Sequence, residues 1–282
     1  METMIITDSA ADLPASLAKQ KDIEIITLPV SFDGESVTDA DEFWARLLAG
    51  GLAKTSQPSP EDVRSVFERA KAEGKAAVFI TISSALSGTY ETAVQLAKET
   101  EYEHLYVLDS RCASLCEGVI AEEAASLRDA GLSASEIYAR LTEFRSRVRL
   151  CACINTLQYL ARGGRISPVV AKVGSLLHIK PMITFLEDGS ISVCAKVPGL
   201  AKAQKKLLEL LPAEKLDPAY PLTPIFSYES DNAETMIENC KSAGIAVDET
   251  RLFCIGPTIG THIGPGGFGV VYVLKKETDG TL

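Results

Sequence analysis

The sequence predicts an α/β fold with two domains, and three observations support this prediction. Short apolar runs alternate with amphipathic stretches in the first half of the 282-residue chain, a pattern typical of a mostly parallel sheet with flanking helices. In the second half, Glu187-Asp188-Gly189 separates two extended runs and predicts an antiparallel hairpin. The hydrophobic fraction of 46% is sufficient for packed cores. We expect an N-terminal domain over residues 1–150 and a C-terminal α/β domain with a mixed sheet over residues 151–282.

In the N-terminal part, runs rich in apolar and β-branched residues predict four strands: Met4 to Thr7, Ile23 to Phe32, Ala76 to Ile82 and His104 to Leu108. Apolar residues spaced three and four apart predict helices over Leu13 to Gln20, Asp41 to Ala49, Pro60 to Ala72, Thr89 to Glu99, Ser114 to Ala130 and Ala134 to Val148. One helix start is especially well defined. Ser59 is expected to cap it, because Pro60 takes the first helical position and two acidic residues follow.

The C-terminal part has a different pattern of predicted strands and helices from the N-terminal part. Strands are expected at Leu150 to Ile154, Ile179 to Leu186, Ser190 to Ala195, Thr223 to Tyr228, Arg251 to Ile255 and Gly269 to Leu274. One short helix is expected to end at Gly163-Gly164. Further helical segments are expected over Ser167 to Leu177, Leu200 to Leu211 and Asn232 to Ala243. The proline-containing stretch from Leu211 to Pro224 is interpreted as a loop and not as a domain linker.

Charge and hydropathy exclude several partners. The net charge of −10 argues against a broad phosphate-binding surface, so nucleic acid is not an expected partner. No run approaches the roughly 18 to 20 apolar residues of a membrane span, and any membrane contact is expected to be transient and peripheral. No apolar signal segment follows Met1. These features predict a cytoplasmic protein.

The seven cysteines form an odd set without a C-x-x-C pair, which is typical of reduced thiols. Cys112 with Cys116, and Cys151 with Cys153, could suggest a metal site, but none of the three histidines lies near either pair. Their alternative role as small buried hydrophobes is favoured. Neither a metal nor another cofactor is expected.

One turn is crowded with hydroxyls. Thr81 to Tyr90 joins a predicted strand to a predicted helix and contains Ser83, Ser84, Ser87 and Thr89. Backbone N–H groups and the dipole at a helix start favour an anion. Because the turn contains no lysine and lacks the spacing of a nucleotide phosphate loop, a carboxylate is the better candidate. The alternative is an ordinary helix start, with Ser87 or Thr89 as cap and Gly88 easing the turn.

Three further segments are rich in glycine and hydroxyl residues: Lys54 to Ser59, Arg162 to Ser167 and Gly256 to Gly266. All three are expected to be loops, and loops at the ends of parallel strands are where such sheets bind ligands. His262, beside Thr261 in the third loop, is expected to contact the ligand, although a lone histidine is more often a hydrogen-bonded loop residue. Arg165 follows two glycines and either satisfies helix carbonyls or places a charge at the site mouth.

The sequence meets the requirements of two enzyme motifs only in part. Gly264 to Gly269 fits G-x-G-x-x-G, but the match precedes a strand where a dinucleotide fingerprint opens a helix, so it is interpreted as chance. Ser87, His262 and Asp109 could supply a nucleophile, a base and an orienting acid, which leaves an acyl hydrolase or acyltransferase as the alternative function. The G-x-S-x-G motif of such enzymes is missing.

Acid-hydroxyl pairs follow two predicted strands, at Asp8-Ser9 and at Asp109-Ser110. Their similar placement predicts strand-end loops on the same edge of the sheet. They are interpreted as helix caps or as supports of the site.

Five motifs in register resemble the DegV family over nearly the whole chain. They are T-S-Q-P-S at 55–59, S-S-A-L-S-G-T-Y at 83–90, L-x-Y-L-A-R-G-G-R-I-S at 157–167, L-L-H-I-K-P at 176–181 and I-G-T-H-I-G-P-G at 259–266. The resemblance implies a two-domain α/β fold that holds one long-chain fatty acid. It also implies a carrier role as the binding subunit of bacterial fatty acid kinase, whose separate ATP-binding subunit makes an acyl phosphate for phospholipid synthesis.

The resemblance also implies roles for individual residues. Thr55 and Ser87 match the hydroxyls that bind the carboxylate, with Ser56, Gly88 and Thr261 beside them, and His262 matches the histidine near the headgroup. Arg165 matches a basic residue at the pocket mouth, and Lys180 and Lys196 are expected on the same rim or partner face. The chain reads Ala195 to Gly199 where the family pattern often has arginine. No residue is expected to be catalytic. A purely structural or regulatory interaction module is a third possible role.

Overall fold

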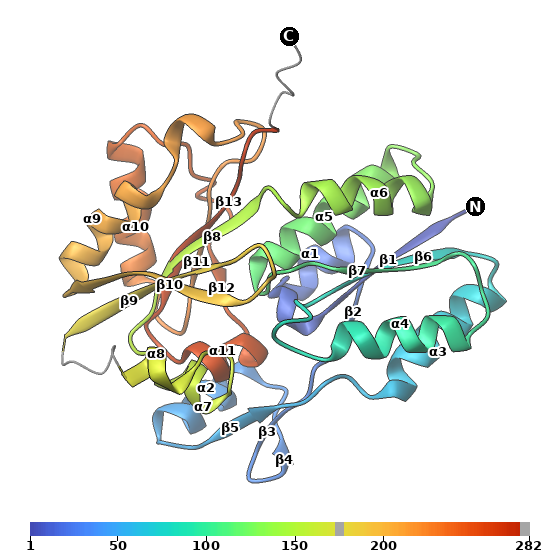
Figure 1. Cartoon of the computed structure of the whole chain (residues 1–282), viewed down its shortest axis with the longest axis horizontal. Coiled ribbons are helices and arrows are strands. Elements are labelled where there is room, and N and C mark those ends of the chain that lie inside the picture. The colour runs from blue at the N-terminus through green and yellow to red at the C-terminus, as the bar shows by residue number, and fades with distance from the viewer. Residues whose placement is uncertain (173–177, 277–282) are drawn as a thin grey trace.

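A computed structural model describes residues 1–172 and 178–276, which contain three β-sheets (Figure 1). The first is a four-stranded sheet in the order β2-β1-β6-β7, and all its neighbouring strands run parallel. The expected parallel N-terminal sheet is therefore confirmed. Its strands are β1 (Thr3–Asp8), β2 (Ile23–Ile26), β6 (Ala76–Thr81) and β7 (Leu105–Asp109).

Helices cover both faces of this parallel sheet, as a crossover connection between parallel strands requires. One face carries α1 (Ala15–Gln20), α5 (Leu115–Asp129) and α6 (Ala134–Phe144). The other carries α3 (Pro60–Ala72) and α4 (Thr89–Glu99), which lie together below the sheet in Figure 1. The predicted cap of α3 is confirmed, because the Ser59 hydroxyl accepts the N–H of Asp62 at 3.0 Å.

The second sheet has six strands in the order β10-β9-β8-β13-β11-β12 and is mixed, as expected. Its strands are β8 (Val148–Cys153), β9 (Ile179–Phe185), β10 (Ile191–Pro198), β11 (Thr223–Phe226), β12 (Phe253–Cys254) and β13 (Phe268–Val273). The predicted hairpin is the β9-β10 pair. Helices α9 (Leu200–Leu210) and α10 (Asp231–Ser242) cover one face, and α5 packs against the other.

A small third sheet was missed by the sequence patterns. It joins β3 (Val30–Phe32), β4 (Glu35–Ser36) and β5 (Ala53–Thr55) in the order β4-β3-β5. The single strand expected from Ile23 to Phe32 is wrong, because the chain leaves the parallel sheet after Ile26 and enters the small sheet at Val30. Pro29 lies between the two strands and lacks the N–H that a continuous ladder needs.

The remaining elements are short. They are η1 (Ser9–Ala11), α2 (Ala40–Leu48), α7 (Gln158–Arg162), α8 (Pro168–Lys172), η2 (Ala213–Lys215) and α11 (Pro257–Ile263). The helix expected from Ser167 to Leu177 is described only as α8, and residues 173–177 lie outside the described residues, as do the first two residues of the motif at 176–181.

The segment from Gly256 to Gly266 is not the loop that its glycines suggested. It forms α11, with Pro257 in the first turn and Gly264 in a left-handed conformation (φ 70°) just after the last turn. Gly260 lowers the helix propensity but is required by packing. A Cβ there would lie 2.9 Å from atoms of the Phe43 and Trp44 rings.

The largest core cluster is continuous between the two large sheets, with α5 between them. Ile5 and Ile80 of the parallel sheet and Leu150 and Ile225 of the mixed sheet all belong to it. The boundary expected after residue 150 falls inside β8, Val148–Cys153, and stays a prediction.

Asp12 joins three segments at this junction. It follows η1, and its carboxylate accepts the Ser114 hydroxyl at 2.6 Å before α5 and the Gly256 N–H at 2.9 Å before α11. Burial raises the pKa of Asp12 to about 7. The carboxyl therefore tends to remain protonated in the folded protein at pH values where it ionises in the unfolded chain.

We expect Asp12→Asn to change how stability depends on pH. A raised folded-state pKa means that folding binds more protons than the unfolded chain does, so the contribution of Asp12 to stability falls as pH rises from about 4 to about 7. The free energy of unfolding of Asp12→Asn relative to wild type should rise through this window, by up to about 1.4 kcal/mol per pH unit. Denaturant unfolding at several pH values tests this, and a pH-independent difference would contradict it.

Candidate functional site

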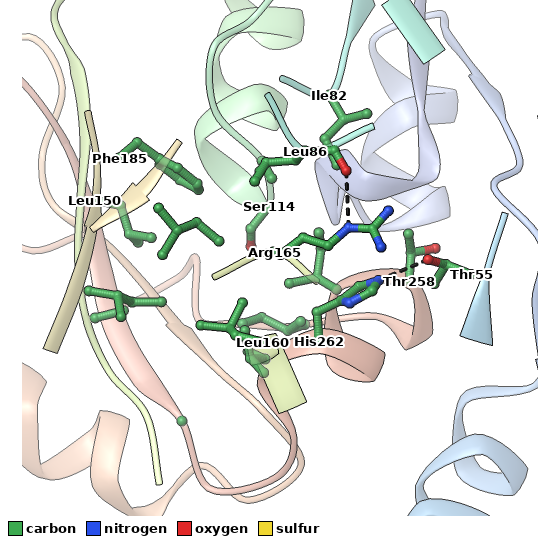
Figure 2. A pocket seen from close by; sticks show the side chains of 18 of the residues that line it. Thr55, Ile82, Leu86, Ser114, Leu150, Leu160, Arg165, Phe185, Thr258 and His262 are labelled. Atoms are coloured by element: carbon green, nitrogen blue, oxygen red, sulfur yellow. Dashed lines mark hydrogen bonds between the residues drawn. The ribbon is translucent and has the colours of Figure 1, made fainter. Parts of the chain in front are cut away.

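A cavity of about 390 Å³ lies between the two large sheets, within the size range of small-molecule sites. Its lining changes character from one end to the other. Figure 2 shows Leu150 and Phe185 at the left and Thr55 and the head of Arg165 at the right, with Leu160 beside His262 between them. The apolar wall includes Ala152, Ile154, Ile183, Ile191, Ile225 and Ile255, from strands β8 and β11, the β9-β10 hairpin and the end of β12.

The hydroxyl-rich turn after β6 forms part of the polar end. Two strand-end carboxylates fix its backbone: Asp8 Oδ2 accepts the Ile82 N–H at 2.9 Å, and Asp109 accepts both the N–H and the hydroxyl of Ser84, at 3.1 and 2.7 Å. Asp8 also caps η1 through the Ala10 N–H. Asp8 therefore takes both roles considered for these acids, as a helix cap and as a support of the turn, and Asp109 supports the turn.

Ser87 and Gly88 bring this turn to the cavity. Both line it at the start of α4, where Gly88 occupies the N-cap position. Among the described residues, no side chain caps α4, which differs from the ordinary helix start considered as the alternative. The Ser87 and Thr89 hydroxyls lie 2.9 Å apart. Unpaired N–H groups at this helix end leave donors that an anion can use.

Thr55 and His262 meet from distant parts of the chain. The Thr55 hydroxyl oxygen and His262 Nε2 are 2.8 Å apart, as the dashed line in Figure 2 marks. Thr55 ends β5, and His262 lies on the face of α11 that also presents Thr258 and Ile259 to the cavity. This contact connects the small sheet to the helix and fixes the orientation of the imidazole.

His262 is held neutral. Burial, with a smaller contribution from the nearby Arg165 guanidinium, lowers the pKa of His262 to about 4. Within the described residues, His262 Nδ1 is buried without a hydrogen-bond partner. It packs on Gly163, where a Cβ would lie 2.2 Å from Nδ1. At neutral pH the ring is a hydrogen-bonding group and not a cation.

Arg165 places a positive charge at the polar end. Its Nε donates to the Leu86 carbonyl at 3.0 Å, and Nη1 donates to the Gly163 carbonyl. Arg165 thus satisfies a carbonyl at the end of α7 and also lines the cavity, and its role as a charge at the site mouth stays a prediction. The bond to Leu86 connects the α7 end to the turn after β6.

Three predicted residues lie outside the cavity lining. The Thr261 hydroxyl donates to the Pro257 carbonyl one turn earlier in α11, and Thr261 lies on a different face of the helix from His262. Lys180 Nζ donates to Asn155 Oδ1 at 2.6 Å. Lys196 pairs with Pro181 at the end of the β9-β10 hairpin away from its turn, whereas the cavity uses the residues near that turn.

The polar end of the cavity opens at an exposed rim. Ser56 and Gln57 both line the cavity and are both exposed, and Ser56 was predicted from sequence whereas Gln57 was not. Gln57 stands directly after two predicted site residues, so its position in the T-S-Q-P-S motif was the available signal. A ligand held here would have one end near solvent.

The hydrolase arrangement is not assembled. Ser87 Oγ pairs with Thr89, His262 Nε2 pairs with Thr55, and Asp109 binds Ser84 and the N–H of Arg111. The three groups of the hypothetical triad therefore each have a different partner.

Within residues 1–172 and 178–276, no cluster of three or more histidine, cysteine or acidic side chains is placed to hold a metal ion. No helix in these ranges combines the length and the hydropathy needed to cross a membrane.

The chain is similar to proteins of one family over nearly its whole length. A family model described as "Uncharacterised protein, DegV family COG1307" matches residues 2–275. The DegV domain-containing protein TTE1491 of Caldanaerobacter subterraneus subsp. tengcongensis is 30% identical, covering 96% of this chain and 98% of that protein. A solved structure described as fatty acid binding of a DegV family protein from Thermus thermophilus has a TM-score of 0.87 and 28% identity, covering 98% and 100% of the two chains. DegV, a fatty acid binding protein from Bacillus subtilis, has a TM-score of 0.81, 28% identity and the same coverage.

We expect the His262 ring to titrate with a midpoint near 4 when its proton resonances are followed by NMR. Arg165→Gln should raise the midpoint, because it removes a nearby positive charge, but should leave it below the usual value of about 6.5, because burial is the larger cause. A wild-type midpoint near 6.5 would contradict the assignment of a neutral buried imidazole.

Proposed function

We propose that this chain, which belongs to the DegV family, binds one long-chain fatty acid with its tail in the apolar part of the cavity and its carboxylate at the polar end. The observation that carries the proposal is the polarity of this single cavity. Apolar side chains of the mixed sheet line one end, and hydroxyls, His262 and Arg165 line the other. The fatty acid binding described for the Thermus thermophilus and Bacillus subtilis structures supports it.

The tail supplies most of the binding free energy. Each methylene moved from water into an apolar site contributes about 0.8 kcal/mol, so about fifteen carbons contribute on the order of 10 kcal/mol before ordering costs. A lipid that leaves a membrane has already left water, and most of this gain then cancels. The shape of the apolar wall therefore selects the chain.

The head contributes orientation. A hydrogen bond to a charged group contributes about 1.5 to 3 kcal/mol, which is small beside the tail but sufficient to decide which end faces the rim. Thr55 and Ser87 supply hydroxyls. When His262 Nε2–H donates to Thr55 Oγ1, the Thr55 hydroxyl hydrogen is available to donate to the carboxylate. A neutral imidazole performs this role without forming an ion pair with the ligand.

The exposed rim supports presentation of the carboxylate to a second enzyme. In this proposal a separate ATP-binding kinase subunit docks at the rim, and a carboxylate oxygen attacks the γ-phosphorus of ATP. The bond to ADP breaks, and the product is an acyl phosphate for phospholipid synthesis. The chain performs no catalysis itself, works in the cytoplasm and makes transient contact with a membrane surface to exchange lipid. Lys180, Lys196 and Arg165 are proposed to contribute to the partner face.

Protein purified from bacteria should carry a fatty acid. Native mass spectrometry is expected to show a mass increment of one long-chain fatty acid, which denaturing conditions remove. Delipidated protein should then take up a labelled fatty acid with saturation at one per chain. Empty protein with no saturable uptake would reject the proposed function.

Removing the head hydroxyls should weaken carboxylate binding without unfolding the protein. We expect Ser87→Ala or Thr55→Ala to raise the Kd for a fatty acid about 10-fold or more, because each loses a hydrogen bond to a charged group. Fluorescence competition measures the Kd. Ser65→Ala, which changes an exposed hydroxyl on α3, is the matched control. Equal affinities in all variants would contradict these roles.

The kinase step has its own test. The loaded chain, mixed with an ATP-binding kinase subunit from the same organism and radiolabelled ATP, should yield a hydroxylamine-sensitive acyl phosphate. The chain alone should yield none. A serine-directed fluorophosphonate that labelled Ser87 would instead favour the hydrolase alternative.

A further inference from the structure

Gln57 occupies an unusual position beside the polar end of the cavity. It lines the cavity from the segment between β5 and α3, and its side chain is exposed at the rim. Its Oε1 accepts the hydroxyl of Thr92, from the first turns of α4, at 2.9 Å. The carboxamide is thereby fixed with its nitrogen directed away from Thr92.

The Gln57 Nε2 atom lies against the backbone of Gly88. A Cβ added to Gly88 would be 2.4 Å from Gln57 Nε2, so the amide group rests directly on the Gly88 backbone. The backbone of Gly88, with φ −76° and ψ 11°, has a negative φ and does not require glycine. Glycine is therefore needed for the close approach of Gln57 and not for backbone conformation.

The chemistry of this group is that of a neutral donor for an anion. Because Oε1 is occupied by Thr92, the Nε2 hydrogens are the part of the amide available beside Ser87 and the uncapped start of α4. A carboxylate accepts such hydrogen bonds at full strength, whereas an alcohol or ester head accepts them more weakly. A lysine here would bind the carboxylate more tightly but would also reduce its nucleophilicity.

We propose that Gln57 is a specificity-determining residue that donates from Nε2 to the carboxylate of the bound lipid and so selects fatty acids over neutral lipids of the same length. This inference rests on the proposed function and names the side chain that recognises the carboxylate of the lipid. Thr92 sets the direction of the amide, and Gly88 leaves the space for it.

The test compares two probes, palmitic acid and hexadecanol, by competition with a fluorescent fatty acid. We expect Gln57→Ala to raise the Kd for palmitic acid about 10-fold and to leave the Kd for hexadecanol within about 2-fold. Gln57→Glu should lose more affinity for the acid, because it places a like charge beside the carboxylate. Gln95→Ala is the matched control, since Gln95 is a glutamine on α4 that donates to Glu99 away from the cavity.

Gly88→Ala provides an independent arm. A Cβ at position 88 would displace the Gln57 amide, so Gly88→Ala alone should lower the ratio of the affinity for palmitic acid to that for hexadecanol. Added to Gln57→Ala, Gly88→Ala should not lower this ratio further. An unchanged ratio in Gln57→Ala, with normal binding of palmitic acid by wild type, overturns this inference alone. If wild-type protein binds neither probe, the proposed function fails and this inference fails with it.

Discussion

The polar end of the cavity depends on the packing of one short helix. Helix α11 has seven residues, including Pro257 and Gly260, whereas isolated helices shorter than about 12 to 15 residues are marginal in water. Tertiary contacts therefore hold it in place. The Phe43 and Trp44 rings lie against Gly260, and Asp12 accepts the Gly256 N–H at its start. Any change that displaces α11 also displaces His262 and Thr258 from the cavity wall.

This dependence explains the chemical state of the polar end of the cavity. Packing on Gly163 buries the His262 ring, which keeps it neutral beside Arg165 and leaves Nε2 to pair with Thr55. Arg165 in turn bridges the end of α7 to the Leu86 carbonyl. The small sheet, α11, α7 and the turn after β6 are thus joined through three side chains. These contacts among the protein's own side chains preorganise the polar end of the cavity.

The sequence predicted the parts of the fold that periodicity determines. The parallel sheet, the hairpin and the long helices have regular apolar spacing, and the hydroxyl turn stands between two clear elements. The small sheet and α11 were not predictable in this way, because strands of two or three residues carry no periodicity and the glycine in α11 serves a tertiary contact. The same limit applies to the site. The sequence predicted Thr55, Ser87 and His262 as site residues, and all three line the cavity, but only the fold shows that Thr261 bonds within its own helix.

The arrangement of polar groups favours a binding protein over an acyl-transfer enzyme. Ser87 could become a nucleophile only if a base approached it, yet His262 is engaged with Thr55 and Asp109 with Ser84. Assembling a triad would break both hydrogen bonds, and each break that leaves a buried polar group unpaired costs about 1 to 3 kcal/mol. The Asp109 bonds also hold the turn that positions Ser87, so recruiting Asp109 would displace the nucleophile. In the proposed function the ligand's carboxylate is itself the nucleophile toward phosphorus, so the hydrogen bonds of His262 and Asp109 can remain as they are.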